Sequence, residues 1–414
     1  MMRATRIAVL FLGIPWLASA SYGYAQSDLP PAKILRSLQF VQDSVVMGDH
    51  SAREMQKYLL ETIDSSLRTS DASIFEDSRN ADAALAYIMS GGNPQTLDYL
   101  VARDVQGHFD SRVINILQKY FNGRGVQVEK IITDILPEYR TGVLGPYLML
   151  IAGNIAISRD PAASLAFFDD ARLTAPGTII EEAALRRSIV AMIQAKDHEK
   201  TLLYVRKYAV RFLHSPYASQ FADLFVSFVV DGFGAITKEN IEEIARLMDP
   251  ERAEEIYLRI ARQASLRGQV ELARFATEEA TTLSSETGDV SRVALSKLYS
   301  GLASVSSDAV HTASEALASI PNDELSSRDL ALRDAARSIA EQIVRQPTGE
   351  SSGQGQNTSV VAQGSTTAPQ AVVQAAQRQN PAAQAVAEAP LMEFFGKSRA
   401  RLNEIDSLLD QEER

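Results

Sequence analysis

The sequence predicts an all-α fold in which short helices stack as successive pairs. From about residue 28 to residue 346 the apolar positions recur with a period of 3.6, which is the period of an α-helix. Strand-like alternation over four or more residues is scarce, and several stretches open with a capping residue followed by proline. One helix is indicated by an apolar stripe at i, i+3, i+4, i+7 and i+8 that ends at a glycine in the C′ position: Phe221, Leu224, Phe225, Phe228, Val229 and Gly232.

Residues 1–25 have the three parts of a secretory signal peptide. Arg3 and Arg6 supply a short positive region, an apolar run follows, and small residues come next. The run is shorter than the roughly 20 apolar residues that a membrane span needs, which argues against a retained anchor. We expect cleavage after Ala25, with Ala20 as the alternative.

The whole chain is acidic and contains no cysteine. Its 41 Lys and Arg residues against 52 Asp and Glu give a formal net charge of −11, so no bulk attraction to nucleic acid or anionic lipid is expected. The absence of cysteine excludes a disulfide scaffold, thiolate metal sites and iron–sulfur clusters. A secreted chain of this kind favours the Gram-negative periplasm, with stability from packing alone. No segment of the mature chain is long and apolar enough to span a bilayer.

The helical body is predicted to extend from residue 26 to residue 346, and its helix starts are the most specific signal. A capping side chain accepts hydrogen bonds from free backbone N–H groups, while proline at the next position has a preset φ and lacks a donor that the helix could not use. This combination predicts many short helices joined by tight turns. It occurs four times, at Asn93-Pro94, Asp160-Pro161, Ser215-Pro216 and Asp249-Pro250.

Two stretches of the body resemble tetratricopeptide-like helix pairs. The first covers residues 146–174, and its second helix has Ser164, Phe168 and Ala171 at the spacing of small and aromatic residues in such repeats. The second covers residues 249–283 around Gly268, with Ala273, Thr277 and Ala280 at the same spacing. The period of 34 residues is not maintained between them. The sequence therefore predicts a degenerate array, an α-solenoid, with an irregular helical bundle as the alternative.

The composition changes at residue 347, and residues 347–390 form a Gln/Ala-rich segment. It contains eight Gln and ten Ala but only three charged residues and no aromatic residue. Such a segment cannot bury enough apolar surface to offset chain entropy, so we predict a disordered linker.

Residues 391–414 are predicted to form a terminal amphipathic helix. Apolar residues step along it by four and three, as in the a/d seam of a coiled coil, and Ser398 is the polar member of the seam. An exposed seam of this kind rarely stays unburied, so we expect it either to bind another chain or to fold back. The predicted partner-binding residues are Leu391, Phe395, Leu402, Ile405 and Leu409.

The sequence contains no recognisable catalytic, cofactor or metal motif. No two of the five histidines lie at i, i+4, and neither a His-Glu-x-x-His helix nor a Gly-x-Ser-x-Gly elbow is present. Carboxylate doublets are expected to lie on solvated helix faces, because neighbouring helical residues point about 100° apart. They are Asp169-Asp170, Glu181-Glu182, Glu242-Glu243, Glu254-Glu255 and Glu278-Glu279. We therefore expect no enzyme, no cofactor and no metal.

Four blocks of the body, together with the leader, carry a resemblance to a known family. They are PYLMLIAGN at 146–154, FFDDARLTAPGT at 167–178, EEAALRRSI at 181–189 and RFLHSPYASQFA at 211–222. These resemble the MotC family, periplasmic motility proteins of rhizobial-type flagellar motors, over the mature chain to about residue 346. The resemblance implies a non-enzymatic protein that binds the periplasmic domain of MotB, the stator subunit that grips peptidoglycan, and supports its folding or stability. It implies no catalytic residues.

Two other functions remain open at this stage. One is a tetratricopeptide-like periplasmic scaffold in envelope assembly without a link to motility. The other is a cell-wall lytic transglycosylase, since such enzymes also use α-superhelices. That enzyme needs a buried acid followed by serine, and the nearest pair, Glu350-Ser351, falls in the predicted linker.

Overall fold

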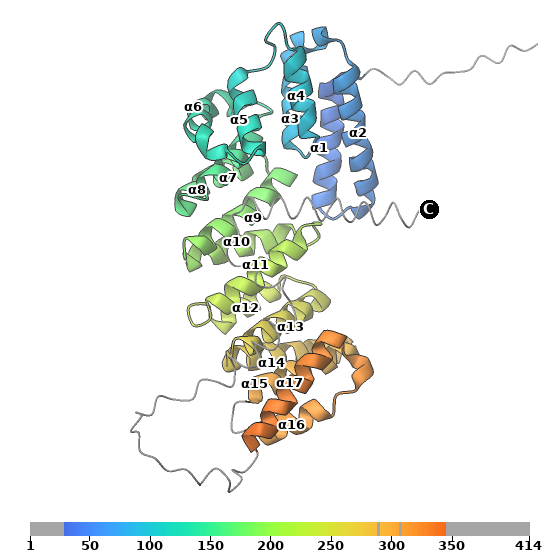
Figure 1. Cartoon of the computed structure of the whole chain (residues 1–414), viewed down its shortest axis with the longest axis vertical. Coiled ribbons are helices and arrows are strands. Elements are labelled where there is room, and N and C mark those ends of the chain that lie inside the picture. The colour runs from blue at the N-terminus through green and yellow to red at the C-terminus, as the bar shows by residue number, and fades with distance from the viewer. Residues whose placement is uncertain (1–28, 288–289, 306–308, 345–414) are drawn as a thin grey trace, which may run out of the picture.

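The computed structural model describes residues 29–344, apart from 288–289 and 306–308, and this part of the chain is all-α (Figure 1). The predicted fold class is confirmed. Among these residues no β-strand occurs, and one isolated bridge joins Phe233 and Ile236. The α-helices are α1 (Pro31–Val46), α2 (Arg53–Thr69), α3 (Ser78–Met89), α4 (Pro94–Arg103), α5 (Ser111–Phe121), α6 (Glu129–Tyr139), α7 (Gly145–Ala156), α8 (Pro161–Thr174), α9 (Ile179–Gln194), α10 (His198–Arg211), α11 (Ala218–Asp231), α12 (Lys238–Ala245), α13 (Pro250–Leu266), α14 (Val270–Thr287), α15 (Val290–Ser304), α16 (Val310–Ala318) and α17 (Ser327–Val344). Short 3-10 helices are η1 (His50–Ala52), η2 (Ala72–Glu76), η3 (Gly125–Val128) and η4 (Asn322–Glu324).

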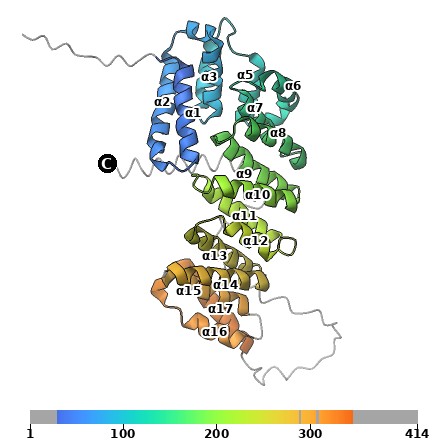
Figure 2. The same ribbon diagram turned by 180° about the vertical axis from the view of Figure 1, so that it is seen from behind.

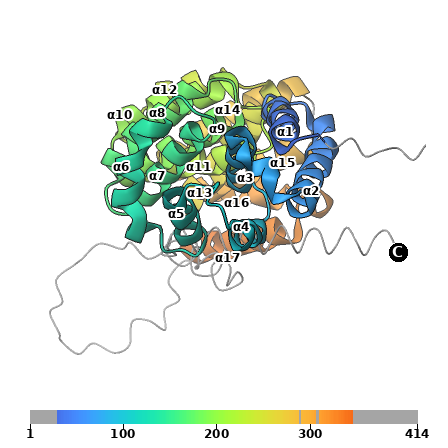
Figure 3. The ribbon, with the colours of Figure 1, turned by 90° about the horizontal axis from the view of Figure 1, so that it is seen from above.

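The helices beyond α6 form an elongated array of pairs. Helix α7 packs on α8, α9 on α10, α13 on α14 and α15 on α16. From α7 to α15, each odd-numbered helix also contacts the next odd-numbered one, so these helices form a continuous row. Helices α6, α8, α10 and α12 line one edge of the molecule (Figures 1 and 2). Seen along the long axis, α8, α10 and α12 lie on one side and α17 on the opposite side, so the pairs turn as they stack (Figure 3).

Helix α1 connects the N-terminal helices to the middle of this array. The Asp43 carboxylate accepts a hydrogen bond of 3.0 Å from the backbone N–H of Ile179 at the start of α9. Beyond α1 the chain turns at Gly48, whose φ is +109° and where an added Cβ would lie 2.8 Å from the Cβ of His214. Only glycine fits this left-handed turn against the His214 side chain.

The first predicted helix pair is confirmed as α7 and α8. The buried residues of α8 are Ser164, Phe168 and Ala171, the three positions that the spacing assigns to the interface. The Phe168 ring lies over Gly153 of α7, where an added Cβ would approach the ring to 2.4 Å. The two helix backbones can therefore come close only because small residues face the aromatic ring.

The second predicted pair is confirmed as α13 and α14. Ala273, Thr277 and Ala280 of α14 are all buried, and the turn between the helices passes through Gly268, whose φ is +70°. The same spacing thus produces the same packing in two places of the array.

Ion pairs connect successive helix pairs at a nearly constant separation along the chain. Arg259 of α13 pairs with Asp223 of α11, and Arg267 pairs with Asp231, each 36 residues earlier. The Tyr204 hydroxyl of α10 donates to Asp169 of α8 at 2.8 Å, 35 residues earlier. These separations correspond to one helix pair, so each of these contacts joins a helix to its counterpart in the preceding pair. The array is repeat-like although its sequence period is degenerate.

Three of the four predicted cap-and-proline starts are confirmed. Asn93, Asp160 and Asp249 cap α4, α8 and α13, and each side chain accepts from a backbone N–H of the first turn. The fourth prediction is wrong by two residues. Helix α11 begins at Ala218, while the Ser215 hydroxyl accepts from the backbone N–H of Tyr217 and closes a turn before the helix.

The end of α11 also differs from the prediction. Gly232 has a φ of −103°, so it does not occupy the left-handed C′ position. A glycine is needed at this position because any side chain would collide with Ile236: an added Cβ would lie 2.6 Å from the Cδ1 atom of Ile236. The amphipathic stripe itself is confirmed, since Phe221, Phe225, Phe228 and Val229 are buried and Leu224 is partly buried.

The expectation that carboxylate doublets face solvent is wrong for Glu181-Glu182 and for Glu254. Glu182 is 0% exposed and accepts hydrogen bonds from Arg186 at 3.0 Å and from the Tyr208 hydroxyl at 2.8 Å. Its neighbour Glu181 is 5% exposed and pairs with Arg211 at 3.1 Å. A buried carboxylate is stable only when it is paired and hydrogen-bonded, and the doublet spacing gives no sign of the distant partners Tyr208 and Arg211.

Glu254 is also buried, at 0% exposure. Its Oε2 atom pairs with Arg292 of α15 at 3.0 Å, and its Oε1 atom accepts from Ser284 of α14. The next residue, Glu255, is exposed as expected. The carboxylate of Glu254 thus connects three helices of the C-terminal half.

We predict that Asp110→Asn lowers the free energy of unfolding by about 1 kcal/mol at pH 7, because asparagine can still cap α5 but lacks the charge that pairs with Arg112 at 2.7 Å. Asp110 caps α5, and its pKa is lowered to about 2 by the Arg112 side chain, by the Tyr139 hydroxyl and by the backbone N–H of Arg112. Because the folded pKa lies below the unfolded value of about 3.9, this stabilisation is present above that value and is lost as the pH falls toward 2.

Urea denaturation of both proteins between pH 7 and pH 2 measures this difference. It should shrink steadily below about pH 4. Asp98→Asn, at an exposed position of α4, serves as the control and should change stability little at any pH. A difference for Asp110→Asn that does not change with pH would contradict the assignment.

Three predicted segments lie outside the described residues: the leader at 1–25, the linker at 347–390 and the terminal helix at 391–414. Within the described part of the chain, no helix combines the length and apolar character needed to cross a bilayer.

Candidate interaction groove

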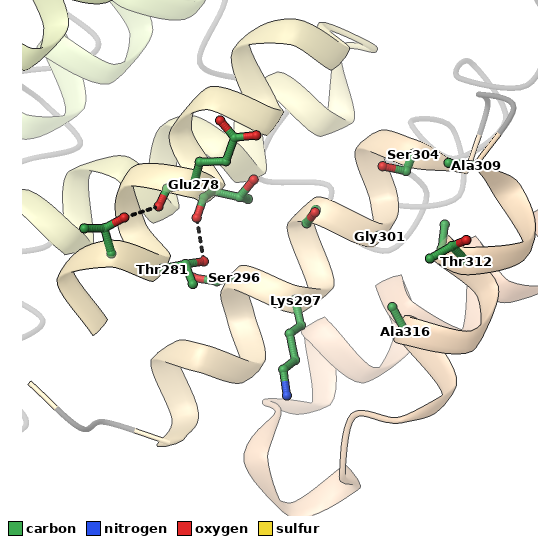
Figure 4. Close-up of a pocket in the computed structure, with 13 residues that line it drawn as sticks. Glu278, Thr281, Ser296, Lys297, Gly301, Ser304, Ala309, Thr312 and Ala316 are labelled. Atoms are coloured by element: carbon green, nitrogen blue, oxygen red, sulfur yellow. Dashed lines mark hydrogen bonds between the residues drawn. The ribbon is translucent and has the colours of Figure 1, made fainter. Parts of the chain in front are cut away.

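A groove of about 490 Å³ lies between α14, α15 and α16 near the C-terminal end of the array. Helix α15 contributes its floor, and α14 and α16 contribute its walls (Figure 4). Almost all of its lining side chains are small. We call it the small-residue groove and define it by Thr277, Glu278, Thr281, Ser296, Lys297, Ser300, Gly301, Thr312, Ala313 and Ala316.

The floor of the groove stays open because α15 and α16 have small residues where they meet. At Gly301 an added Cβ would lie 2.7 Å from the Leu317 side chain of α16. Ala313 is buried, and Ala316 is partly buried, on the α16 wall. The Leu317 side chain covers Gly301, whereas most of the other lining residues of α15 and α16 are small. The groove can therefore admit side chains from another segment beside this contact.

One polar group in the groove has no partner among the described residues. Ser296 is 2% exposed, and its Oγ atom makes no hydrogen bond. Leaving a buried hydroxyl unsatisfied costs about 1–3 kcal/mol. In Figure 4 this side chain lies between the α14 wall and the floor, near Thr281. A polar group of a docked segment would remove that cost.

The rim of the groove on α14 is acidic. Glu278 is exposed and lines the groove, and Glu279 follows it. Burial raises the pKa of Glu279, and the negative charges of Glu242 and Glu278 raise it further. Lys297 of α15 is the basic residue of the lining. The α14 rim therefore presents the Glu278 carboxylate, which lies 3.9 Å from Arg274, to a segment that enters from that side.

The comparisons with known proteins give the family. The family model for the chemotaxis protein MotC matches residues 1–414. The chain belongs to the MotC family. The chemotaxis protein MotC of Rhizobium meliloti (strain 1021) is 49% identical to it over 350 residues, which cover 84% of this chain and 80% of that protein. No solved structure matches the chain.

Membership of the MotC family confirms the resemblance drawn from the four sequence blocks. It assigns the chain a role in chemotaxis and motility, and it is not the family of a known enzyme. The helical array described above is thus the fold of a MotC protein. Its relation to tetratricopeptide repeats stays a prediction.

The partner-binding residues that the sequence predicts in this MotC chain lie outside the described residues: Leu391, Phe395, Leu402, Ile405 and Leu409. The small-residue groove was not predicted. Its signal is present in α15, where Ser296, Ser300, Gly301 and Ser304 recur on one side of the helix. Sequence alone could not distinguish this pattern from a close contact with a neighbouring helix.

A second surface of the MotC array is unusually apolar for exposed helices. Phe40 of α1 is 74% exposed, and Tyr58 of α2 is 60% exposed. Met47 and Met55, close to the turn between the two helices, are about half exposed. Large exposed apolar side chains that gather on one face of a protein commonly mark contact surfaces.

Neither surface has the composition of a metal site. In the described ranges, no group of three His, Cys, Asp or Glu side chains is arranged to hold a metal ion. The Glu350-Ser351 pair considered for a lytic enzyme lies outside these ranges.

Proposed function

We propose that this protein works in the periplasm, where it binds the periplasmic domain of the stator protein MotB and supports its folding or stability. Flagellar rotation then depends on it without any reaction being catalysed. The observation that carries this proposal is the match of the MotC family model to the whole chain. The predicted leader at residues 1–25 supports export to the compartment where that domain resides.

The architecture is suited to binding a partner. A helical array offers an extended surface built from successive pairs, and such surfaces accept a helix or a tail of another protein. Within the proposed function, the seam of residues 391–409 is the partner-binding segment, with Leu391, Phe395, Leu402, Ile405 and Leu409 as its apolar contacts.

Deletion of the gene tests the motility role. The expected result is cells that assemble flagella but do not swim, because the stator lacks a stable periplasmic domain. Expression of the intact chain from a plasmid should restore swimming. Envelope defects in cells that swim normally would contradict the proposal and favour the scaffold function.

Capture of the purified MotB periplasmic domain by the full mature chain tests the partner. Leu402→Asp places a charge in the apolar seam and is expected to weaken capture about tenfold or more, since burying an unpaired carboxylate is costly. Ser407→Asp adds the same charge on the opposite side of the predicted helix and should leave capture unchanged. Equal capture by both variants would remove the seam from the proposal.

A further inference from the structure

We propose that the small-residue groove holds the chain's own segment 391–414, so that the partner-binding seam is covered in cis until a partner displaces it. The proposal that the segment docks rests on the position and lining of the groove and does not depend on the proposed function. Its role as a regulator of partner binding rests on the proposed function.

The position of the groove favours a segment of the same chain. Helix α17 packs on α16 and α15, which form one wall and the floor of the groove, and the described chain ends at Val344 of α17 (Figures 1 and 2). Forty-six residues separate Val344 from Leu391. A flexible arm of that length has a root-mean-square reach of about 35–40 Å. Tethering of this kind gives an effective concentration on the order of millimolar, so even modest affinity suffices for docking.

The groove and the seam match in shape. The seam offers large side chains, among them Phe395 and Leu402, at successive turns of a helix. The groove offers small side chains at Ser300, Thr312 and Ala316, which leave room for such side chains to enter. Large residues of one helix packing between small residues of others is the arrangement already observed where Phe168 lies over Gly153.

The groove and the seam also match in polarity. Ser398 is the polar residue within the seam, and Ser296 is the buried groove residue whose hydroxyl has no partner. A hydrogen bond between the two hydroxyls would satisfy both and fix the register of the docked helix, as single polar residues do in coiled coils. Without such a partner, the Ser296 hydroxyl stays unsatisfied at a cost of about 1–3 kcal/mol.

Charge complementarity sets the orientation. Lys397, Arg399 and Arg401 make the first half of the segment basic. On the α14 rim of the groove, Glu278 is the acidic lining residue. Docking that places a basic residue of the segment beside Glu278 would bring opposite charges together at this rim.

The test uses the absence of cysteine from the chain. In the full mature protein, Ser296→Cys combined with Ser398→Cys introduces one thiol into the groove and one into the seam with little change in size. We expect a mild thiol oxidant to form an intramolecular disulfide at a rate that does not depend on protein concentration. Adding Leu402→Asp to this pair should slow the reaction about tenfold or more, because the seam no longer docks.

The matched control pairs Ser398→Cys with Ser319→Cys, an exposed serine at the end of α16 outside the groove. This pair reports random collisions of the tethered arm and should react about tenfold more slowly than the groove pair. Equal rates for the two pairs would overturn the proposal. Crosslinked dimers that increase with protein concentration would also overturn it, since the occupant would then be a second copy.

The crosslink is measured without MotB, so the two proposals fail separately. Failure of the MotB domain to bind contradicts the proposed function and leaves docking in cis standing. A groove disulfide that does not form contradicts docking in cis, whatever the MotB domain does.

Discussion

Glu182→Ala is expected to lower the free energy of unfolding by about 3–5 kcal/mol, the range for removing one partner of a buried ion pair. Glu182 is 0% exposed, and its carboxylate accepts from Arg186 Nε at 3.0 Å, from another guanidinium nitrogen of Arg186 at 3.1 Å, and from the Tyr208 hydroxyl at 2.8 Å. Alanine would leave a largely buried guanidinium and a buried phenol without their acceptor. Guanidinium chloride denaturation followed by helical circular dichroism measures the loss.

Two further variants distinguish the loss of stability caused by breaking a buried ion pair from the general effect of removing a carboxylate. Glu255→Ala removes an exposed carboxylate of α13 and should change the free energy of unfolding by less than about 0.5 kcal/mol. The double variant Glu182→Leu with Arg186→Met replaces both charges by apolar groups and should recover much of the stability lost by Glu182→Ala. A loss for Glu182→Ala no greater than that for Glu255→Ala would contradict the burial of the pair.

Phe168→Ala is expected to lower the free energy of unfolding by about 3–5 kcal/mol through loss of apolar burial and creation of a cavity. The ring is 0% exposed and fills the interface between α7 and α8 against Gly153. Because a helical array is stabilised by contacts between neighbouring pairs, the loss should weaken this region first. Denaturant unfolding gives the free energy, and hydrogen exchange of α7 and α8 amides locates it.

Leu173→Ala is the matched control for Phe168→Ala, since it removes an apolar side chain from the same helix at a position that is 65% exposed. It should change stability by less than about 0.5 kcal/mol. Gly153→Ala provides a second check. Its added methyl group would meet the Phe168 ring, so it should destabilise the normal protein but be tolerated when Phe168 is already alanine. Additive losses in the double variant would argue against direct packing of these residues.

Some features of this chain follow from local sequence and were predicted correctly. The helix starts at Asn93, Asp160 and Asp249 depend on one side chain and the next few backbone N–H groups, so a short stretch determines them. The same holds for the apolar stripe of α11 and for Ser164, Phe168 and Ala171 of α8, because helical periodicity decides which residues share a face.

Other features depend on partners that are distant along the chain. Ser215-Pro216 has the residues of a helix start, yet the helix begins two residues later. Glu182 belongs to a doublet with the pattern of a solvated face, yet Tyr208 is 26 residues away and buries it. The small-residue groove likewise depends on how α14, α15 and α16 pack, including the close contact of Gly301 of α15 with Leu317 of α16.

The sequence by itself determined the all-α class, three helix starts, two helix pairs and the family of this protein, since these depend on local hydrogen bonding, helical period and shared sequence blocks. Only the tertiary structure decided which carboxylates are buried, why Gly232 must be glycine and where a groove remains open. Burial and close approach are properties of pairs of helices, and the position of a helix relative to its neighbours depends on packing along the whole array.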